Sequence, residues 1–484
     1  MRLSTTLAST RVGDVHIHET FQVIELDAGH QVEETKLSSA AVDGSYTVPF
    51  SHQAIHAIEK ELAIIVPCKD EDVSILDGVL HGIPHDCLII LLSNSKPGNY
   101  AAERAHLMDY CTASQRSSIA AHQHDAGIAQ AFIAAGMPQI VTDNRHTPHI
   151  RNGKGEAMII GVVLAKLVGK RFVGFVDADN LVAGSVHEYC KVYAAGLHYA
   201  LHCDKQDDGV RAMVRIKWNS KPKVQDGEIV FEKSGRSSRV VNHWMNRLLN
   251  VLDNHCGQTD MIQTGNAGEH AMSIDYALEL KFATGYAVEP YQLIDTWERL
   301  AGSVAIDNPR VAEPRHTLAL NYTLKAADLD NEAHNSSDES TAADSSPPST
   351  TSTPASSRRP SLLPCPSPCP PAPSRKVRIL QIQTRNPHFH DTGKGADHIS
   401  KMQAEGLSTI YHSRFAPETL KSELRHYVQA NLAGVAGVSE DGELAVPRIY
   451  PAIGTLDFAV FRSVLKARSV ALQIVGEDAG AVLL

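Results

Sequence analysis

Short apolar runs alternate with segments of helical pattern over the first two hundred residues, and this alternation limits the fold more than any other feature. Runs expected to form strands lie at residues 62–66, 88–92, 118–122 and 172–176. Helices are expected at residues 73–80, 127–135, 154–168 and 185–201. Because strands separated by helices form βαβ units, we expect an α/β protein with a largely parallel sheet.

The rest of the chain is divided by a low-complexity segment. From Asn335 to Ser374, 26 of 40 residues are Ser, Thr or Pro. Such a segment can bury too little apolar surface to offset the entropy lost when a chain becomes ordered. We therefore expect a core at residues 1–334, a disordered insert at 335–374 and a mostly helical segment at 375–484. Further strands are expected as a pair at 211–218 and 228–232 and singly at 376–384, and further helices at 240–252, 397–405 and 417–432.

Composition excludes several classes of protein. The chain has 484 residues and a net charge of −10, whereas a nucleic-acid-binding protein normally carries a basic excess. No run of eighteen apolar residues and no secretory leader is evident, and the eight cysteines form no CxxC pair. The expectation is a cytoplasmic protein that binds neither membrane nor nucleic acid.

Two carboxylates follow the apolar run at 172–176, in the sequence Asp177-Ala178-Asp179. In open α/β sheets, ligands bind beyond the carboxyl ends of the strands, so both acids would face a substrate crevice. Paired carboxylate oxygens suit a hard cation such as Mg²⁺ or Mn²⁺, which can hold a diphosphate. Acids spaced in this way are also common in solvated turns, so the pair indicates a metal site only together with the neighbouring motifs.

Polar clusters follow the other expected strands as well. They contain Pro67, Lys69 and Glu71 after the first strand, Ser93 after the second and Gln123 after the third. Each cluster alone is explained by ordinary loop chemistry, but four in succession fit one shared crevice better. Lys154, in the Gly-containing stretch before a helix, is a candidate diphosphate contact, with a solvated loop lysine as the equal alternative.

Two later segments concentrate polar side chains. The loop at 264–273 contains Asn266, Gly268 and Glu269, a composition that suits sugar binding but also a capped turn. His388 and His390 could supply a nitrogen ligand to a metal, although such pairs are more often structural. Basic residues that could hold an acidic acceptor, or merely form a solvated face, are Arg215, Lys221, Lys223, Arg236 and Arg239.

The order of motifs along the chain resembles that of the mannosyl-3-phosphoglycerate synthases. The matching stretches, over roughly residues 10–330 and 376–410, are VPCKDE, LLSNS, HQHD, RNGKGEAM, GFVDADN, VRIKW with KPK, GNAGEHAMS, GYAVEP and QTRNPHFHD. The resemblance implies a GT-A fold (Rossmann-like, as in nucleotide-diphospho-sugar transferases) with a helical C-terminal extension. It also implies retaining transfer of mannose from GDP-mannose to 3-phosphoglycerate, which leads to the compatible solute mannosylglycerate. A homodimer is one assembly open to such an enzyme.

The same resemblance assigns roles to single residues. It places Asp177 and Asp179 at the metal and nucleotide sugar, with Ala178 between them, and Glu269 with Asn266 and Gly268 at the transferred sugar. Pro67, Lys69, Glu71, Ser93, Gln123 and Lys154 fall on segments that contact GDP. Arg215 is expected to bind the substrate on the ground of its charge alone, apart from the resemblance. A histidine from the C-terminal segment, His388 or His390, completes the site of a divalent cation, Mg²⁺ with Mn²⁺ or Co²⁺ as alternatives. The chain departs from the family pattern in Lys69-Asp70-Glu71, where Arg-Asn-Glu is usual, and in its Ser/Pro-rich insert.

Two other enzyme classes use similar features. Haloacid-dehalogenase-type phosphatases carry a strand followed by DxD, but Leu181 stands here where their motif wants Thr or Val. Sugar nucleotidyltransferases normally show a Gly-rich N-terminal signature, which this chain lacks. No carboxylate is evidently placed as a covalent nucleophile, so attack on the front face, assisted by the leaving phosphate, is the mechanism that the resemblance favours.

Overall fold

The computed structural model describes residues 1–5, 9–25, 46–143, 148–202, 211–225, 228–232, 235–253, 260–300, 376–389, 396–468 and 472–476. All of these belong to one compact unit, which is formed by residues 1–307 and 375–484. The insert expected at 335–374 and the candidate ligand His390 lie outside the described residues.

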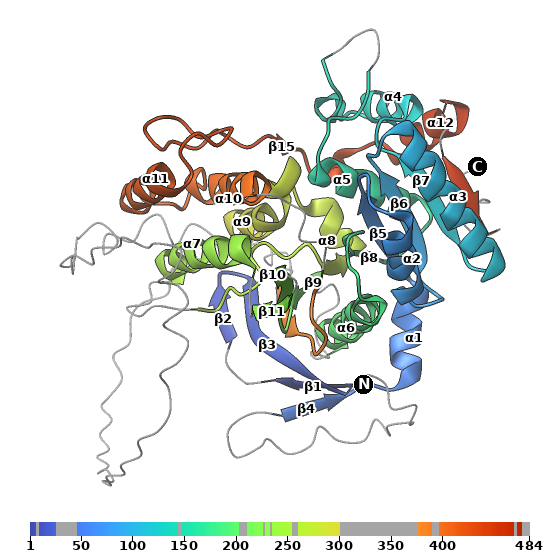
Figure 1. Ribbon diagram of the computed structural model, residues 1–484, viewed down its shortest axis with the longest axis horizontal. Coiled ribbons are helices and arrows are strands. Elements are labelled where there is room, and N and C mark those ends of the chain that lie inside the picture. Colours follow the sequence, from blue (N-terminus) through green and yellow to red (C-terminus); the bar gives the residue numbers. More distant parts are fainter. Residues whose placement is uncertain are drawn as a thin grey trace, which may run out of the picture. The chain divides into compact units, whose positions relative to one another are not determined.

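Twelve strands of the described chain form one mixed sheet, in the order β16-β7-β6-β5-β8-β12-β9-β14-β3-β1-β4, with β2 paired to β3 (Figure 1). One half is parallel and consists of β5 (Leu62–Cys68), β6 (Leu88–Ser93), β7 (Ser118–His122) and β8 (Phe172–Phe175). In the other half, β9 (Arg211–Lys217), β14 (Val377–Gln383) and β3 (Val15–Glu25) are parallel to one another. The antiparallel strand β12 (His270–Ser273) joins the halves.

The remaining strands lie at the margins or in small sheets. Antiparallel margins are formed by β1 (Arg2–Thr5), β2 (Ser9–Val12), β4 (Tyr46–Pro49) and β16 (Gln473–Val475). Two-stranded sheets pair β10 (Lys221–Gln225) with β11 (Glu228–Glu232), and β13 (Phe282–Ala283) with β15 (Ile449–Tyr450). One half of the sheet is parallel and Rossmann-like, and it continues through one antiparallel strand into a mixed sheet. This arrangement confirms the α/β class and the expected GT-A type.

Helices cover both faces of the sheet and enclose one hydrophobic core on each. One core is closed by α1 (His52–Lys60), α2 (Val73–Gly82), α3 (Pro97–Ala113) and α6 (Ala183–His202). The other is closed by α4 (Ala126–Ala134), α5 (Lys154–Leu167), α7 (Arg236–Asp253), α8 (Ile274–Glu279), α9 (Val288–Leu300), α10 (Ala396–Tyr411), α11 (Glu418–Asn431) and α12 (Phe458–Arg468). Figure 1 shows α12 beside α4 and α10 beside α9, so late helices pack on early ones.

Most expected elements are present, but one pairing was wrong. The pair predicted from residues 211–218 and 228–232 does not form, because β9 pairs with β12 and β14, and β11 pairs with β10 instead. The sheet is also more mixed than expected, since β12 and the marginal strands run antiparallel. β14, which follows residues 301–375 outside the described part of the chain, lies inside the sheet between β9 and β3.

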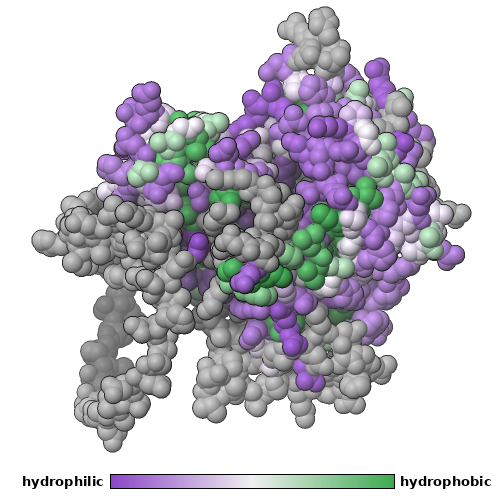
Figure 2. Space-filling model, viewed as in Figure 1, coloured by the Kyte–Doolittle hydropathy of each residue, from purple (hydrophilic) through white to green (hydrophobic). Residues whose placement is uncertain are grey.

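The visible surface is largely hydrophilic, with hydrophobic side chains gathered near the middle of the face in Figure 2, where Figure 1 places β10 and β11. Ile229, Val230 and Phe231 of β11 are among the exposed large apolar residues. Within the described residues, no helix combines the length and apolar character needed to cross a membrane.

Candidate active site

The acidic loop after β8 lies at the carboxyl edge of the parallel strands, as the sequence predicted. Asp179 and Ala178 are buried, whereas the Asp177 side chain is 31% exposed. The turn is fixed by the next residue, because the side-chain oxygen of Asn180 accepts a hydrogen bond of 3.0 Å from the backbone N–H of Val182. The two carboxylates are therefore held on a short ordered loop.

Lys154 begins helix α5 and points at this loop. Its ammonium nitrogen lies 2.5 Å from a carboxylate oxygen of Asp177 and 2.9 Å from one of Glu289. Burial lowers the pKa of Lys154, but the carboxylates of Asp177 and Glu289 outweigh it and raise the pKa well above its ordinary value. Gly268 permits this approach, since a Cβ there would collide with both Asp177 and Lys154.

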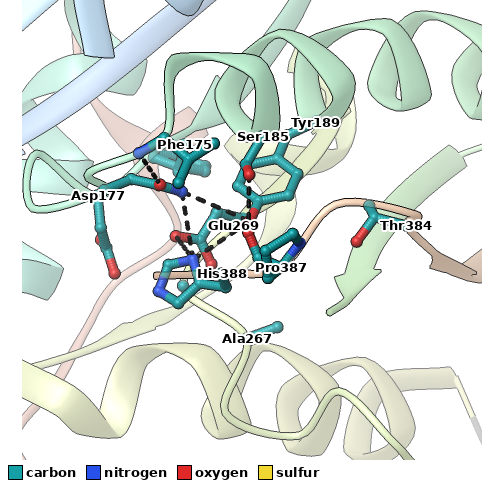
Figure 3. A network of polar contacts seen from close by, with 12 residues as sticks. Phe175, Asp177, Ser185, Tyr189, Ala267, Glu269, Thr384, Pro387 and His388 are labelled. Atoms are coloured by element: carbon teal, nitrogen blue, oxygen red, sulfur yellow. Dashed lines mark hydrogen bonds and ion pairs between the residues drawn. The ribbon is translucent and has the colours of Figure 1, made fainter. Parts of the chain in front are cut away.

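Glu269 lies fully buried in the middle of the site (Figure 3). Neither of its carboxylate oxygens has a hydrogen-bond partner among the residues that the structure describes. Burial and the neighbouring Asp177 raise the pKa of Glu269 to about 8, against the opposing effect of Lys221. A buried carboxylate without hydrogen bonds is costly to ionise, so burial is the main cause of the raised pKa of Glu269.

His388 reaches Glu269 from the C-terminal segment. Its Nδ1 lies 3.7 Å from Glu269 Oε1, 3.3 Å from the hydroxyl of Tyr189 and 3.4 Å from the amide nitrogen of Asn180. Figure 3 shows the side chains of Tyr189, Glu269 and His388 turned toward one another. Asn180 directly follows Asp179, so His388 contacts the acidic loop itself.

Helix α6 holds the segment that carries His388. The carboxylate of Glu188 accepts hydrogen bonds from the backbone N–H groups of Arg385 (2.6 Å) and Asn386 (2.7 Å). The Ser185 hydroxyl donates to the carbonyl of Pro387 at 2.7 Å. The backbone N–H of Leu181 donates to the carbonyl of Phe389 at 2.8 Å. The histidine is therefore positioned by contacts with residues about two hundred positions earlier in the chain.

Lys221 supplies a second cation to the same site. Its ammonium group lies 3.6 Å from the centre of the Trp218 ring, and the ring centre of His388 lies 4.8 Å from that of Trp218. Burial lowers the pKa of Lys221 to about 8, although the carboxylates of Glu269 and Asp179 oppose that effect. Of the basic residues considered from the sequence, Lys221 is thus one that the structure brings to the acidic cluster.

Arg215 is fully buried, and its hydrogen bonds go to the chain itself. The guanidinium donates to the carbonyls of Thr264 (2.8 and 3.0 Å), Gly265 (3.3 Å) and Glu289 (3.1 Å). It braces the loop that carries Glu269. The expected contact between Arg215 and a substrate stays a prediction without support from this geometry.

The other residues expected to contact substrates differ in how many of their polar atoms already form hydrogen bonds within the protein. Ser93 is buried and donates to Glu103 at 2.6 Å. The amide nitrogen of Gln123 donates to the carbonyls of Arg151 (2.6 Å) and Gly153 (3.2 Å), and its buried Oε1 has no hydrogen-bond partner in the described part of the chain. Asn266 is similar, because its nitrogen donates to Ser237 at 3.2 Å and its buried Oδ1 has no partner within the same described residues. Gln123 and Asn266 therefore offer acceptors that a ligand donor could fill.

The residues after β5 form the more open margin of the site. Pro67 and Glu71 are half-buried and Lys69 is exposed. Asp70 adopts a left-handed conformation with φ of 56°, and its carboxylate accepts hydrogen bonds from the backbone of Lys96 (2.9 Å) and the side chain of Asn99 (2.8 Å). The backbone hydrogen bond from Lys96 lowers the pKa of Asp70. Asp70 therefore shapes the turn at the position where the chain departs from the family's usual Arg-Asn-Glu.

The donor set at the site suits a divalent cation. Three carboxylates (Asp177, Asp179 and Glu269) and the imidazole of His388 lie near one another, and both buried oxygens of Glu269 lack hydrogen bonds to any described residue. Oxygen ligands with one nitrogen are appropriate for Mg²⁺ or Mn²⁺. The ligands are not gathered in advance, because Asp177 is bound to Lys154. Among the described residues, a ready-made group of ligand atoms within 4.8 Å of one another is found elsewhere, at His56, Glu59 and Asp86.

Comparison with known proteins decides the family. Residues 5–465 match the family described as mannosyl-3-phosphoglycerate synthase. The chain belongs to this family. The mannosyl-3-phosphoglycerate synthase of Pyrococcus furiosus is 32% identical over 85% of this chain and 84% of its own length. The corresponding enzyme of Aeropyrum pernix is 27% identical over 97% of this chain and 98% of its own.

Membership of the synthase family confirms the expected class of enzyme, a glycosyltransferase, and sets aside the phosphatase and nucleotidyltransferase alternatives. Among solved structures, a glucosyl-3-phosphoglycerate synthase from Mycobacterium tuberculosis, in complex with phosphoglyceric acid, has a TM-score of 0.41 and 15% identity over 82% of this chain and 94% of its own. That similarity is too low to add to the evidence from the family.

Sequence reasoning missed several residues of the site. Tyr189 and Trp218 are apolar enough to pass as core residues, whereas Asn180 and Glu289 lie within the matching stretches GFVDADN and GYAVEP but were not predicted as site residues. Glu289 lies in GYAVEP, one of the stretches that match the family, so a closer look at that motif would have found it.

Proposed function

We propose that the protein catalyses metal-dependent transfer of mannose from GDP-mannose to 3-phosphoglycerate, with retention at the anomeric carbon. The observation that carries the proposal is the meeting of Asp177, Asp179, Glu269 and His388 at the carboxyl edge of the sheet, flanked by the ammonium groups of Lys154 and Lys221. Membership of the mannosyl-3-phosphoglycerate synthase family supports both the sugar and the acceptor.

The residues divide into those that hold the leaving group and those that face the sugar. Asp177, Asp179 and His388 would hold a divalent cation, for which Mg²⁺, Mn²⁺ and Co²⁺ are candidates. When bound, such a cation neutralises charge on the leaving diphosphate. Lys154 stands at the start of α5, where an ammonium group and free backbone N–H groups suit a phosphate. Pro67, Lys69, Glu71, Ser93 and Gln123 line the strand ends where we place the rest of GDP.

Glu269 is the carboxyl group best placed for the sugar. Its burial beside Asp177, Lys221 and His388 supports a role at the anomeric carbon of the bound sugar, where positive charge would develop during transfer. Asn266 and Gly268, on the same loop, would orient the ring. The acceptor would attack from the face that the diphosphate leaves, so the product keeps the configuration of the donor. Of the cations of this cluster, Lys221 is our candidate for the acceptor's negative groups.

The decisive experiment incubates the purified full chain with GDP-mannose, 3-phosphoglycerate and Mn²⁺ or Mg²⁺. We expect GDP and a mannosyl-3-phosphoglycerate whose anomeric configuration, measured by NMR, equals that of the donor. Parallel reactions replace the donor by UDP-glucose, replace the acceptor by glycerate, or contain EDTA. Release of GDP without a sugar adduct, or equal turnover with UDP-glucose, contradicts the proposal. Sedimentation of the same sample tests the predicted homodimer.

A further inference from the structure

A fully buried carboxylate, that of Glu156, lies in the first turn of helix α5, on the same turn as Lys154. It accepts hydrogen bonds from the hydroxyl groups of Thr284 (2.5 Å) and Tyr450 (2.6 Å) and from the backbone N–H of Gly285 (3.2 Å). Hydrogen bonds to a carboxylate are stronger than those between neutral groups. Glu156 therefore ties the start of α5 to two segments that come much later in the chain.

Glycines in the motif around Lys154 let these segments approach the helix. A Cβ at Gly153 would collide with the carboxylate of Glu156, and a Cβ at Gly155 would collide with the backbone carbonyl of Ala283. Ala283 belongs to β13, which pairs with the C-terminal strand β15. The start of α5, the turn after β13 and strand β15 are therefore packed together as one unit.

The turn that Glu156 holds leads directly to Glu289, the second carboxylate partner of Lys154. Thr284 is followed by the 3₁₀ turn Gly285–Ala287 and then by the start of α9, where Glu289 lies. Glu289 Oε1 is 2.9 Å from the ammonium nitrogen of Lys154, and its buried Oε2 has no hydrogen-bond partner among the described residues. The position of this carboxylate therefore depends on the backbone that Glu156 fixes.

A second carboxylate, from helix α10, braces the same turn. Glu405 accepts a hydrogen bond of 2.7 Å from the backbone N–H of Tyr286. Burial raises the pKa of Glu405, and this hydrogen bond opposes the effect. Gly285 has a positive φ of 57°, and a Cβ there would collide with the Glu405 carboxylate. Two acidic side chains thus hold three consecutive residues of the turn before α9.

We propose that Glu156 and Tyr450 are positioning residues for Lys154 in the transferase reaction. The inference rests on the proposed function, in which Lys154 binds the diphosphate of the donor. Once Asp177 serves as a metal ligand, Lys154 retains Glu289 as its carboxylate partner, so the place of Glu289 decides where the ammonium group stands. Tyr450 acts on that place through Glu156 and the turn before α9.

Titration calorimetry of the full chain with GDP, at saturating Mn²⁺, tests these roles. Tyr450→Phe removes one donor to Glu156 and keeps the ring, so it should weaken GDP binding about threefold to tenfold. Thr284→Val should have a similar effect, whereas Thr284→Ser keeps the hydroxyl group and should bind GDP as the wild type does. The matched control is Tyr110→Phe on α3, whose hydroxyl donates to the carbonyl of Leu80 at 3.3 Å. This control should keep the wild-type affinity for GDP, whatever happens to its melting temperature.

A double mutant separates positioning of Lys154 from a general loss of stability. Added to Lys154→Met, Tyr450→Phe should change the affinity for GDP by less than about twofold, because the group that it positions is gone. An equal loss of affinity in both backgrounds overturns the inference, as does an unchanged dissociation constant in Tyr450→Phe alone. A wild type that does not bind GDP at all overturns the proposed function, and the role of Tyr450 with it.

Discussion

The ammonium nitrogen of Lys154 lies 2.5 Å from a carboxylate oxygen of Asp177, so one of the expected metal ligands already forms an ion pair with a lysine of the protein. The same ammonium reaches Glu289, which gives Lys154 a second anionic partner when Asp177 is engaged elsewhere. This arrangement makes metal binding and the position of Lys154 interdependent.

Replacing Lys154 by methionine should therefore have two opposite effects. Turnover should fall, because the candidate phosphate contact is lost, whereas affinity for Mn²⁺ should rise about fivefold or more once Asp177 is released from its ion pair. Titration calorimetry measures the second effect without any substrate. The control is Lys170→Met, since the ammonium group of Lys170 donates a hydrogen bond of 2.5 Å to the backbone carbonyl of Lys60. Unchanged Mn²⁺ affinity in Lys154→Met would show that the ion pair does not compete with the metal.

Asp179→Asn should abolish transfer and leave the fold intact, because it changes the charge of a metal ligand without changing its volume. Turnover at saturating Mn²⁺ and the circular dichroism spectrum are the measurements. Asp109→Asn, at an exposed position on α3, provides the control and should behave as the wild type. Activity retained in Asp179→Asn would remove this residue from the metal site.

His388→Ala should reduce turnover about 10–100-fold or more, the loss typical of metal-site groups, and should weaken Mn²⁺ binding. His388 is the better candidate ligand of the two histidines, since it contacts Asn180 beside the acidic loop. His390→Ala, measured in parallel, should have much the smaller effect. The reverse order would transfer the ligand role to His390.

Arg215→Lys distinguishes a brace from a substrate contact. Lysine cannot make the parallel hydrogen bonds of the guanidinium to Thr264 and Gly265, so the melting temperature should fall and turnover should fall with it. A variant that keeps its melting temperature but has a raised KM for 3-phosphoglycerate would instead support the substrate contact expected from the sequence.

The depressed pKa of His18 predicts how stability depends on pH. Its value of about 4 in the folded chain lies below the ordinary 6.5, because burial and Arg378 disfavour the protonated ring. The unfolded chain therefore binds the proton first, and this contribution to stability is present above pH 6.5 and is lost as the pH falls toward 4. His18→Gln should lessen the loss, by on the order of 2 kcal/mol at pH 4, relative to its value at pH 7. His426→Gln, at an exposed position, is the control; parallel stability profiles for His18→Gln and the wild type would contradict the assignment.

The sequence predicted the local parts of this fold well. The strand expected at 118–122 is β7, and the helix expected at 154–168 is α5, because periodicity and composition act within single segments. It failed where pairing is non-local: β9 takes its partners from β12 and β14 rather than from the neighbouring β11. The four-residue strand β12 has too short a pattern to be recognised at all.

The residues of the candidate site likewise divide into those that the sequence could predict and those that it could not. Asp177 and Asp179 could be found because a strand end and its loop are adjacent in sequence. The positions of Lys221 and Glu289 depend on how distant elements pack. The sequence around each residue does not indicate which charged group it approaches. The resemblance to a family brought the right segments together, but only the structure separates Arg215, which braces a loop, from Lys221, which faces the acidic cluster.

The place of β14 has a consequence for how the protein is made. During synthesis on the ribosome, the residues of β3 and β9 are made before those of β14, the strand that lies between them. Each of these two strands therefore has an unpaired edge until residues 377–383 have left the exit tunnel. Open strand edges invite pairing with other chains. Completion of the sheet is thus deferred to the last quarter of translation, and nascent chains that stall before residue 377 should be the species that chaperones hold.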